Sequence, residues 1–444
     1  MIRRFFSTRR RRQPLLTLAA LCGLMLIPAL AFAQGRDDGS LYSRFGLGEL
    51  RAFASPQSQA MGGGGTALWS WNYINFGNPA SWGRQRLVRA VAGFRFDGVQ
   101  TTDASDNTKS LTNGSLNAIQ FGVPLKDDQL GMGLAFEPYS RVSYRVQTQD
   151  HLIADPTTQD STLYQIDFEG TGGLQQIRGG LGFRVNNTIT LGASLDFIFG
   201  ILEEARRTEF ADFEFAQTNV ATSTRLFGVT STFGALVSFS NLATSNDNFS
   251  LAASFTLPTS LKGDRALTLG ESLSRDTLGA EIEGSMDLPL SARLGLAYEP
   301  DNRWAMVADA RYEPWSQFES ELSFPGYTPG DARLFRDRLR LSAGVEFLPA
   351  GTNLLDSYLE RVAYRLGFYY DQAYVSPVEG IDINTLALTG GLSLPAFTPG
   401  TRLDINVEVG TRGTTDQNLV RDVFYGVSAT LNIGERWFVK RKLR

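Results

Sequence analysis

The sequence predicts an all-β fold: a transmembrane, antiparallel, up-and-down β-barrel of about 14 strands with an N-terminal plug. Three observations predict this fold. The chain begins with an export signal, its later residues alternate between apolar and polar side chains, and the connections between the alternating runs are short and long in turn. After the signal, no segment has the roughly 18 uninterrupted apolar residues of a membrane-spanning helix.

Residues 1–33 have the composition of a secretory signal peptide. Six arginines within residues 3–12 precede an apolar stretch over residues 15–30, and Ala31-Phe32-Ala33 supplies the small residues of a cleavage site before Gln34. Export of a barrel-forming chain predicts the outer membrane of a Gram-negative bacterium as its location, with outer-membrane lipid around it.

The chain that remains after cleavage is acidic. The signal carries 6 of the 42 Lys and Arg residues and none of the 46 Asp and Glu residues, which leaves a formal net charge of −10. Nucleic acid selects for basic surfaces, so a nucleic-acid partner is not expected. The one cysteine, Cys22, lies in the signal, so the mature chain has no thiol for a disulfide or a metal site.

Residues 85–434 are predicted to form the barrel, because they alternate with period two. In one run, Ile189, Leu195 and Phe197 alternate with polar residues such as Asp196. Lipid cannot accommodate the charged face, so the apolar face is expected outside and the charged face in the lumen. The charged residues expected in the lumen are Arg89, Arg95, Arg178, Asp196, Arg293, Asp309, Arg311, Arg340, Glu346, Arg365, Asp404 and Glu408.

The connections and the aromatic residues favour a membrane barrel over a soluble sandwich or propeller. Short turns alternate with long polar segments, such as residues 98–114 and 257–276, as short periplasmic turns and long external loops require. Trp304, Tyr312 and Trp315 are expected in aromatic girdles at the two interfaces. The basic tail, residues 435–444, is expected on the periplasmic side.

Residues 34–84 show little apolar periodicity and are predicted to fold inside the lumen as the plug. Their four consecutive glycines permit close backbone approach and positive φ; these are Gly62, Gly63, Gly64 and Gly65. The tripeptide Asn78-Pro79-Ala80 follows shortly before the first strand.

The order Ala60-Met61-Gly62-Gly63, Thr66-Ala67 and Asn78-Pro79-Ala80 resembles the FadL-type long-chain fatty-acid transporters, which are grouped with toluene and xylene uptake proteins. The opening at Tyr42-Ser43-Arg44-Phe45-Gly46-Leu47-Gly48 and the ending at residues 436–442 resemble a Bacteroidetes-like branch. The resemblance implies a monomeric 14-stranded barrel whose N-terminal hatch lines the path of a hydrophobic ligand. Gly62 to Gly65 and Asn78-Pro79-Ala80 would belong to this hatch.

The resemblance also implies a gap in the wall, because the third strand is kinked in the FadL family. The third predicted strand of this chain contains Pro138. A proline removes a ladder hydrogen bond and is expected only at edges or bulges, so Pro138 is a candidate for the kink. The alternative is that residue 138 already lies at the outer end of the strand, above the lipid.

Enzymatic chemistry is not expected. Barrel enzymes typically combine a histidine with Ser, Asp or Glu, and the only histidine here, His151, lies in a polar stretch after the third strand. No Gly-x-Ser-x-Gly motif is present. The sequence predicts a protein that is not an enzyme and uses no cofactor or metal.

Two functions remain open. The first is passive, hatch-gated transport of hydrophobic or amphipathic small molecules of the fatty-acid kind, with sideways release. The alternative is a non-transporting barrel that serves as a secretion partner or an envelope-structural protein, since the branch also resembles barrels of type IX secretion. The barrel-assembly machinery is expected as a partner during biogenesis. An apolar tunnel across the charged lumen would distinguish the two functions.

Overall fold

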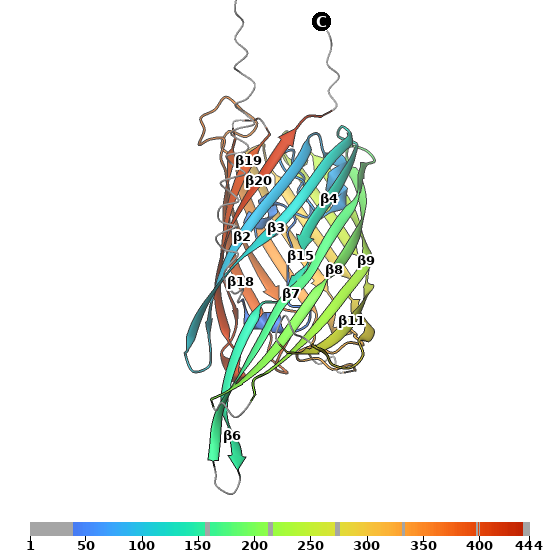
Figure 1. The fold of residues 1–444 in the computed structure, drawn as a ribbon. Coiled ribbons are helices and arrows are strands. Elements are labelled where there is room, and N and C mark those ends of the chain that lie inside the picture. Colours follow the sequence, from blue (N-terminus) through green and yellow to red (C-terminus); the bar gives the residue numbers. More distant parts are fainter. Residues whose placement is uncertain are drawn as a thin grey trace, which may run out of the picture. The chain divides into compact units, whose positions relative to one another are not determined.

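The alternating segments form one closed antiparallel wall (Figure 1). The computed structural model describes residues 39–155, 160–211, 216–270, 276–330, 334–396, 398 and 400–437. The predicted signal, the first five residues of the predicted plug and residues 438–444 of the basic tail lie outside the described residues.

In the described residues the wall closes after 14 strands, as predicted. Each strand pairs antiparallel with the next, and the last pairs along its whole length with the first. In wall order they are β2 (Val88–Thr102), β3 (Thr108–Lys126), β4 (Leu130–Pro138), β7 (Asp160–Arg184), β8 (Ile189–Phe210), β9 (Thr218–Ser240), β10 (Asn248–Thr256), β14 (Ser291–Glu299), β15 (Trp304–Glu313), β16 (Arg338–Phe347), β17 (Ala363–Gln372), β18 (Asn384–Pro395), β19 (Arg402–Gly413) and β20 (Arg421–Glu435).

Several further strands extend the wall beyond these 14 strands. β5 (Ser140–Arg141) and β6 (Tyr144–Asp155) follow β4 in the third strand, and β6 pairs with β7. β11 (Thr259–Leu269) pairs with β9 and with β13 (Ile282–Leu288), and β12 (Asp276–Thr277) pairs with β11. Strand structure therefore reaches into segments that the sequence predicted as loops, because side chains beyond the bilayer are polar on both faces and lose the alternating signal.

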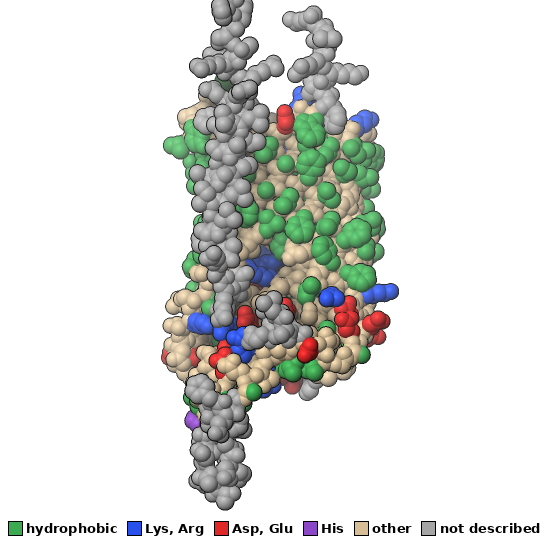
Figure 2. Space-filling model, in the orientation of Figure 1, with side chains coloured by type: hydrophobic (Ala, Val, Ile, Leu, Met, Phe, Trp, Pro, Cys, Tyr) green, Lys and Arg blue, Asp and Glu red, His purple; other side chains and the backbone are tan. Residues whose placement is uncertain are grey.

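The alternation predicted from the sequence places apolar side chains on the outer face of the wall and polar side chains on its inner face. Leu195 and Phe197 of β8 are exposed on the outer face, whereas Asp196 between them is completely buried. Apolar side chains cover the lipid-facing side of the strands in the view of Figure 2, and charged side chains gather at one end of the wall. The outward apolar face and the inward charged face are both as predicted.

The two ends of the barrel differ in their connections. At the end that carries Val88 and Glu435 most turns are short, such as the one between β14 and β15. The exception is the turn over residues 348–362, where the backbone N–H and hydroxyl of Ser357 donate to the carboxylate of Glu360 at 2.9 and 2.7 Å. These bonds hold the pKa of Glu360 below its ordinary value. Leu355 of this turn is 95% exposed.

The opposite end of the lumen holds the largest apolar cluster, and the external segments contribute to it. The rings of Trp315 in η3 (Trp315–Gln317), Phe318, Phe335 and Tyr374 pack against one another, and the ring centroids of Trp315 and Tyr374 are 4.5 Å apart. Trp315 is therefore not a girdle residue, and that prediction was wrong. The chain turns inward after Pro314, and the indole is 1% exposed. Trp304 and Tyr312 do lie on the outer face.

Residues 39–84, here called the N-terminal segment, lie against the inward face of the wall. Their elements are η1 (Leu41–Arg44), β1 (Glu49–Leu50), α2 (Pro56–Ala60) and η2 (Pro79–Arg84). Ser55 and Asn78 cap α2 and η2, each followed by a proline in the first turn, where the missing N–H costs nothing. The other short helix, η4 (Asp416–Asn418), lies between β19 and β20. None of the described helices has the length and apolar content to cross a bilayer.

Candidate functional site

The predicted glycine run lies in a tight turn after α2. The N–H of Gly62 donates to the hydroxyl of Thr389 at 2.9 Å, and its carbonyl accepts from the guanidinium of Arg340 at 3.1 Å. Gly62 has a φ of +74°, and a Cβ there would lie 2.3 Å from the carbonyl oxygen of Phe368. Only glycine fits both the conformation and the approach to the wall.

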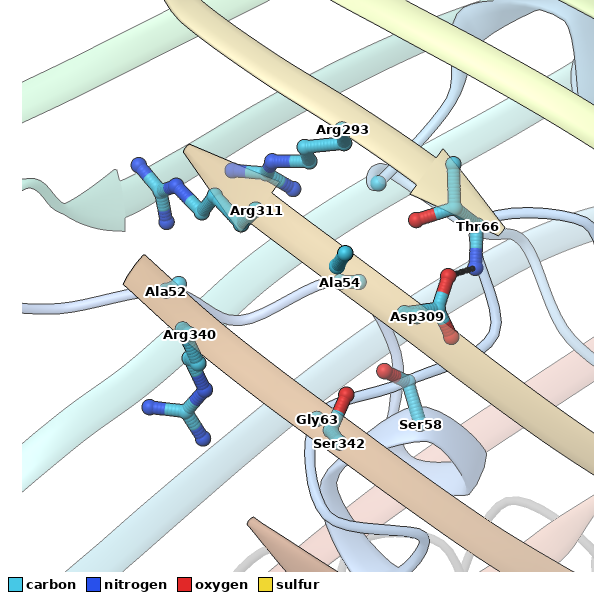
Figure 3. A pocket seen from close by; sticks show the side chains of 12 residues that line it. Ala52, Ala54, Ser58, Gly63, Thr66, Arg293, Asp309, Arg311, Arg340 and Ser342 are labelled. Carbon is cyan, nitrogen blue, oxygen red and sulfur yellow. Dashed lines mark hydrogen bonds between the residues drawn. The ribbon is translucent and has the colours of Figure 1, made fainter. Parts of the chain in front are cut away.

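The second half of the run wraps one carboxylate of the wall. The N–H groups of Gly65 and Thr66 both donate to Asp309 of β15, the latter at 2.9 Å. A Cβ on Gly64 would lie 2.7 Å from the same carboxylate. Figure 3 shows Asp309 beside Thr66, facing the lumen. Consecutive backbone N–H groups bind an anion well, so the glycine run fastens the N-terminal segment to β15.

Asn78-Pro79-Ala80 lies close to this turn. The side-chain amide of Asn78 donates to the carbonyls of Thr66 and of Ala235 in β9, at 3.3 and 3.1 Å, and accepts from the N–H of Ala80 at 3.0 Å. Asn78 and Ala80 are fully buried. The structure thus brings the glycine run and the tripeptide together and ties both to the wall.

The charged lumen is paired within itself. Arg365 donates to Glu346 at 2.5 Å, to Asp404 at 2.7 Å and to the hydroxyl of Tyr73 at 2.7 Å. Arg178 donates to Asp196 at 2.8 Å and to the carbonyl of Phe76 at 2.7 Å. Arg365 and Arg178 therefore pair with predicted lumen carboxylates and also bind atoms of the N-terminal segment, as buried charges require partners.

Hydrogen bonds to the N-terminal segment come from most strands of the ring. The wall residues that make them include Arg89, Gln120, Arg178, Asp309, Arg340, Arg365, Thr389, Asn406 and Asn432. Together with Asn78, these contacts extend from α2 to η2. Rigid-body movement of the segment would break many of them at once.

Charged side chains line two of the cavities left in the lumen. One is lined by Arg293, Arg311, Arg340 and Asp309 together with residues of the N-terminal segment, as Figure 3 shows. A second is lined by Glu137, Arg178 and Glu313 among others.

The wall itself opens beside Pro138. Pro138 is the last residue of β4 and pairs with Gln175 of β7, whereas the ladder between β3 and β4 already ends at the Ile119–Phe136 pair. Beyond this point β5 turns inward and pairs with β1 of the N-terminal segment, Glu49 opposite Arg141. Pro138 has no N–H for a further ladder bond. It lies on the wall, at the end of β4.

Sequence reasoning missed several residues that fasten the N-terminal segment. Tyr42 donates to the carbonyl of Val420, and Tyr374 donates to the carbonyl of Gly48 at 2.6 Å. Tyr73 was missed as well. A tyrosine in an aperiodic segment gives no sequence signal of its partner, because the partner lies hundreds of residues away.

The fold and the occupied, charged lumen define a class of protein: a transmembrane β-barrel of the outer-membrane type with an N-terminal segment in its lumen. The chain belongs to the BamG family, whose model matches residues 16–444. No curated protein sequence matches the chain.

Solved structures of FadL-type barrels share the fold. A Pseudomonas aeruginosa FadL homologue is 14% identical, with a TM-score of 0.54 over 88% of this chain and 99% of that one. The Ralstonia pickettii toluene transporter TbuX is 14% identical, with a TM-score of 0.53 over 87% and 99%. The CymD monoaromatic hydrocarbon channel is 15% identical, with a TM-score of 0.53 over 86% and 97%. The predicted FadL-type fold is thus confirmed, whereas the Bacteroidetes-like branch stays a prediction.

Proposed function

We propose that this chain is a non-conducting outer-membrane barrel that acts as a partner of another envelope protein. The observation that carries the proposal is that hydrogen bonds from most strands of the ring fasten the N-terminal segment, exemplified by Gly65 and Thr66 on Asp309. A hydrophobic molecule would have to break these bonds and then pass charged cavities. Burying an apolar molecule against charged groups is unfavourable, because those groups lose water without gaining a hydrogen bond.

The family supports a particular partner. The prefix Bam in the family name is the abbreviation of the barrel-assembly machinery, so we take that machinery as the first partner to test. In this reading the barrel joins the machinery as a component, beyond being inserted by it. A secretion complex or another envelope structure is the wider form of the same proposal.

Native mass spectrometry of the detergent-purified, full-length protein tests the proposal. We expect a complex that contains an envelope protein and no bound hydrophobic molecule. Planar-bilayer recordings of the isolated barrel should show no steady conductance. A bound fatty acid or hydrocarbon that is lost when Gly62→Ala loosens the glycine turn would instead support transport.

Transport of hydrophobic molecules is the second candidate, because the wall opens beside Pro138 and so offers a lateral exit. Cysteines introduced as Asn113→Cys and Ser143→Cys, at two positions that line one pocket at the opening, can be bridged by a reducible bifunctional thiol reagent, which would close this exit. Uptake of a fluorescent fatty acid that falls on cross-linking and recovers on reduction would favour transport. Unchanged uptake would argue against it.

A further inference from the structure

The two strand edges at the wall opening differ in how the rest of the protein covers them. One side is the third strand, residues 139–143, and the other is the outer part of β3, residues 108–118. An uncovered strand edge presents backbone N–H and C=O groups that need partners, above all at the depth of a membrane. How each edge is covered therefore decides what the opening can bind.

The third strand is covered on both sides. It stays on β7 through Tyr139, whose N–H donates to the carbonyl of Leu174 at 2.8 Å. Its free edge is taken by the N-terminal segment. The N–H of Arg51 donates to the carbonyl of Tyr139 at 2.9 Å, and the Ser43 hydroxyl bonds to both the N–H and the C=O of Ser143 at 3.0 and 2.8 Å.

The outer part of β3 is covered on one side only. Residues 108–118 pair with β2, and the pairing of β3 with β4 is confined to residues 119–126. A register shift between Gly93 and Phe94 of β2 places a bulge at Asn117, which adds to the effect of Pro138 in ending the ladder at this level. Among the described residues, no strand takes the second edge of residues 108–118.

This edge also carries an unsatisfied amide. Asn113 is 7% exposed, and neither its side-chain oxygen nor its nitrogen has a hydrogen-bond partner among the described residues. It lines a pocket at the opening together with Asp97 and Ser143. A buried amide with a free donor and a free acceptor is an exception in folded proteins, and it matches the donor and acceptor of one peptide group.

We infer that the open edge of β3, residues 108–118, accepts an extended segment of a partner protein as an added strand, with the Asn113 side chain pairing with its backbone. This inference deepens the proposed role as a protein partner and rests on it. Backbone bonds along the edge supply the affinity. Lipid-facing Phe94 on the neighbouring strand lies opposite Leu116, so the added strand should alternate apolar and polar residues, as strands of outer-membrane proteins do.

Hydrogen–deuterium exchange of the full-length protein in nanodiscs tests the inference. The probe is a synthetic peptide that copies residues 421–431, an alternating strand of the same barrel. We expect it to slow amide exchange in residues 108–118 about tenfold or more, as pairing of an open edge does. The same peptide with every backbone nitrogen methylated keeps its side chains but cannot donate, and it should give no protection.

A variant then tests the role of the amide. Asn113→Ala should weaken peptide binding about fivefold, the value of one hydrogen bond near 1 kcal/mol. Thr112→Ala on the neighbouring, exposed position should leave binding within about twofold. A shift between heated and unheated samples in gel electrophoresis confirms that both variants fold.

Three outcomes would overturn the inference: no protection of residues 108–118, equal protection by the methylated peptide, or equal protection by dodecane, which would make the opening a route for hydrocarbons. The inference and the proposed function can fail separately. A partner retained in native mass spectrometry without peptide protection leaves the partner role standing and refutes the strand addition. Protection without any retained partner shows that the edge can take an added strand but refutes the partner role, so a partner segment would no longer be its occupant.

Discussion

The outer and inner parts of the lumen are filled by different kinds of interaction. Near the external end, Trp315, Phe318 and Phe335 pack as a buried aromatic cluster. Further in, Arg365 and its acidic partners form a charged network with the N-terminal segment. Apolar burial excludes water but tolerates many arrangements, whereas paired charges require one register. The outer part therefore seals, and the inner part fixes how the N-terminal segment sits.

The largest effect is expected in the charged network. Arg365→Ala leaves Glu346 and Asp404 without their cation in a site where the Arg365 side chain is completely buried. Breaking a buried pair in this way should lower the free energy of unfolding by about 3 to 5 kcal/mol. Urea unfolding in lipid vesicles measures the loss.

The matched control for that variant is Arg225→Ala. This arginine also faces a carboxylate, Asp264 at 3.7 Å, but its side chain is 64% exposed. An exposed pair contributes at most about 1 kcal/mol. Equal losses in the two variants would show that pairing within the lumen is no stronger than pairing at the surface, and that the charged network does not fix the position of the N-terminal segment.

The aromatic cluster should come second. Trp315→Ala removes the indole from its contacts with Phe318 and Tyr374 and should cost about 3 kcal/mol, the lower end for such a truncation, because the surrounding loop residues can partly collapse into the space. Trp315→Phe should restore most of this stability. If the phenylalanine variant is as unstable as the alanine variant, the cluster depends on specific geometry and resembles the charged network after all.

The attachment of the glycine turn should give a smaller, local effect. Asp309→Asn keeps one oxygen for the N–H groups of Gly65 and Thr66 but loses the charge, so about 1 to 2 kcal/mol should be lost. Amide exchange at residues 62–66 should rise while exchange in β15 stays slow. Asp301→Asn, in a turn at the barrel end, is the control and should leave residues 62–66 unchanged.

The smallest effect lies outside both parts of the lumen. Ser357→Ala removes the hydroxyl that donates to Glu360, so the pKa of Glu360 should rise toward its ordinary value. The bond stabilises the ionised form, so it is present above the ordinary pKa and is lost as the pH falls through the lowered one. Carbon-detected NMR of the carboxylate measures the shift, and global unfolding should not change.

The wall was predictable because the bilayer imposes one rule on every strand. Leu195 and Asp196 show it: lipid on one side and a polar lumen on the other force alternation that is readable from the sequence. The rule ends where the bilayer ends. β11 was therefore predicted as a loop, and Trp315 was placed in a girdle although its turn folds inward.

The candidate site was predictable only in part. Gly62 to Gly65 and Asn78 stood out because glycines and caps act locally, whereas their wall partners Asp309 and Thr389 carry no mark that links them to this turn. Asn113, followed by glycine, lay in a segment predicted as an external loop. Its buried, unpaired amide depends on where the third strand leaves the wall, which is a property of the tertiary structure.

The enclosure of the N-terminal segment has a consequence for how the barrel is made. The segment is synthesised first, and β2 follows it directly, yet the wall closes only when β2 meets β20, near the end of the chain. Asp309, Thr389 and Asn406 bind the segment from the inward face of the ring. The N-terminal segment is thus enclosed by strands that are synthesised after it. The pairing of β2 with β20 completes this enclosure.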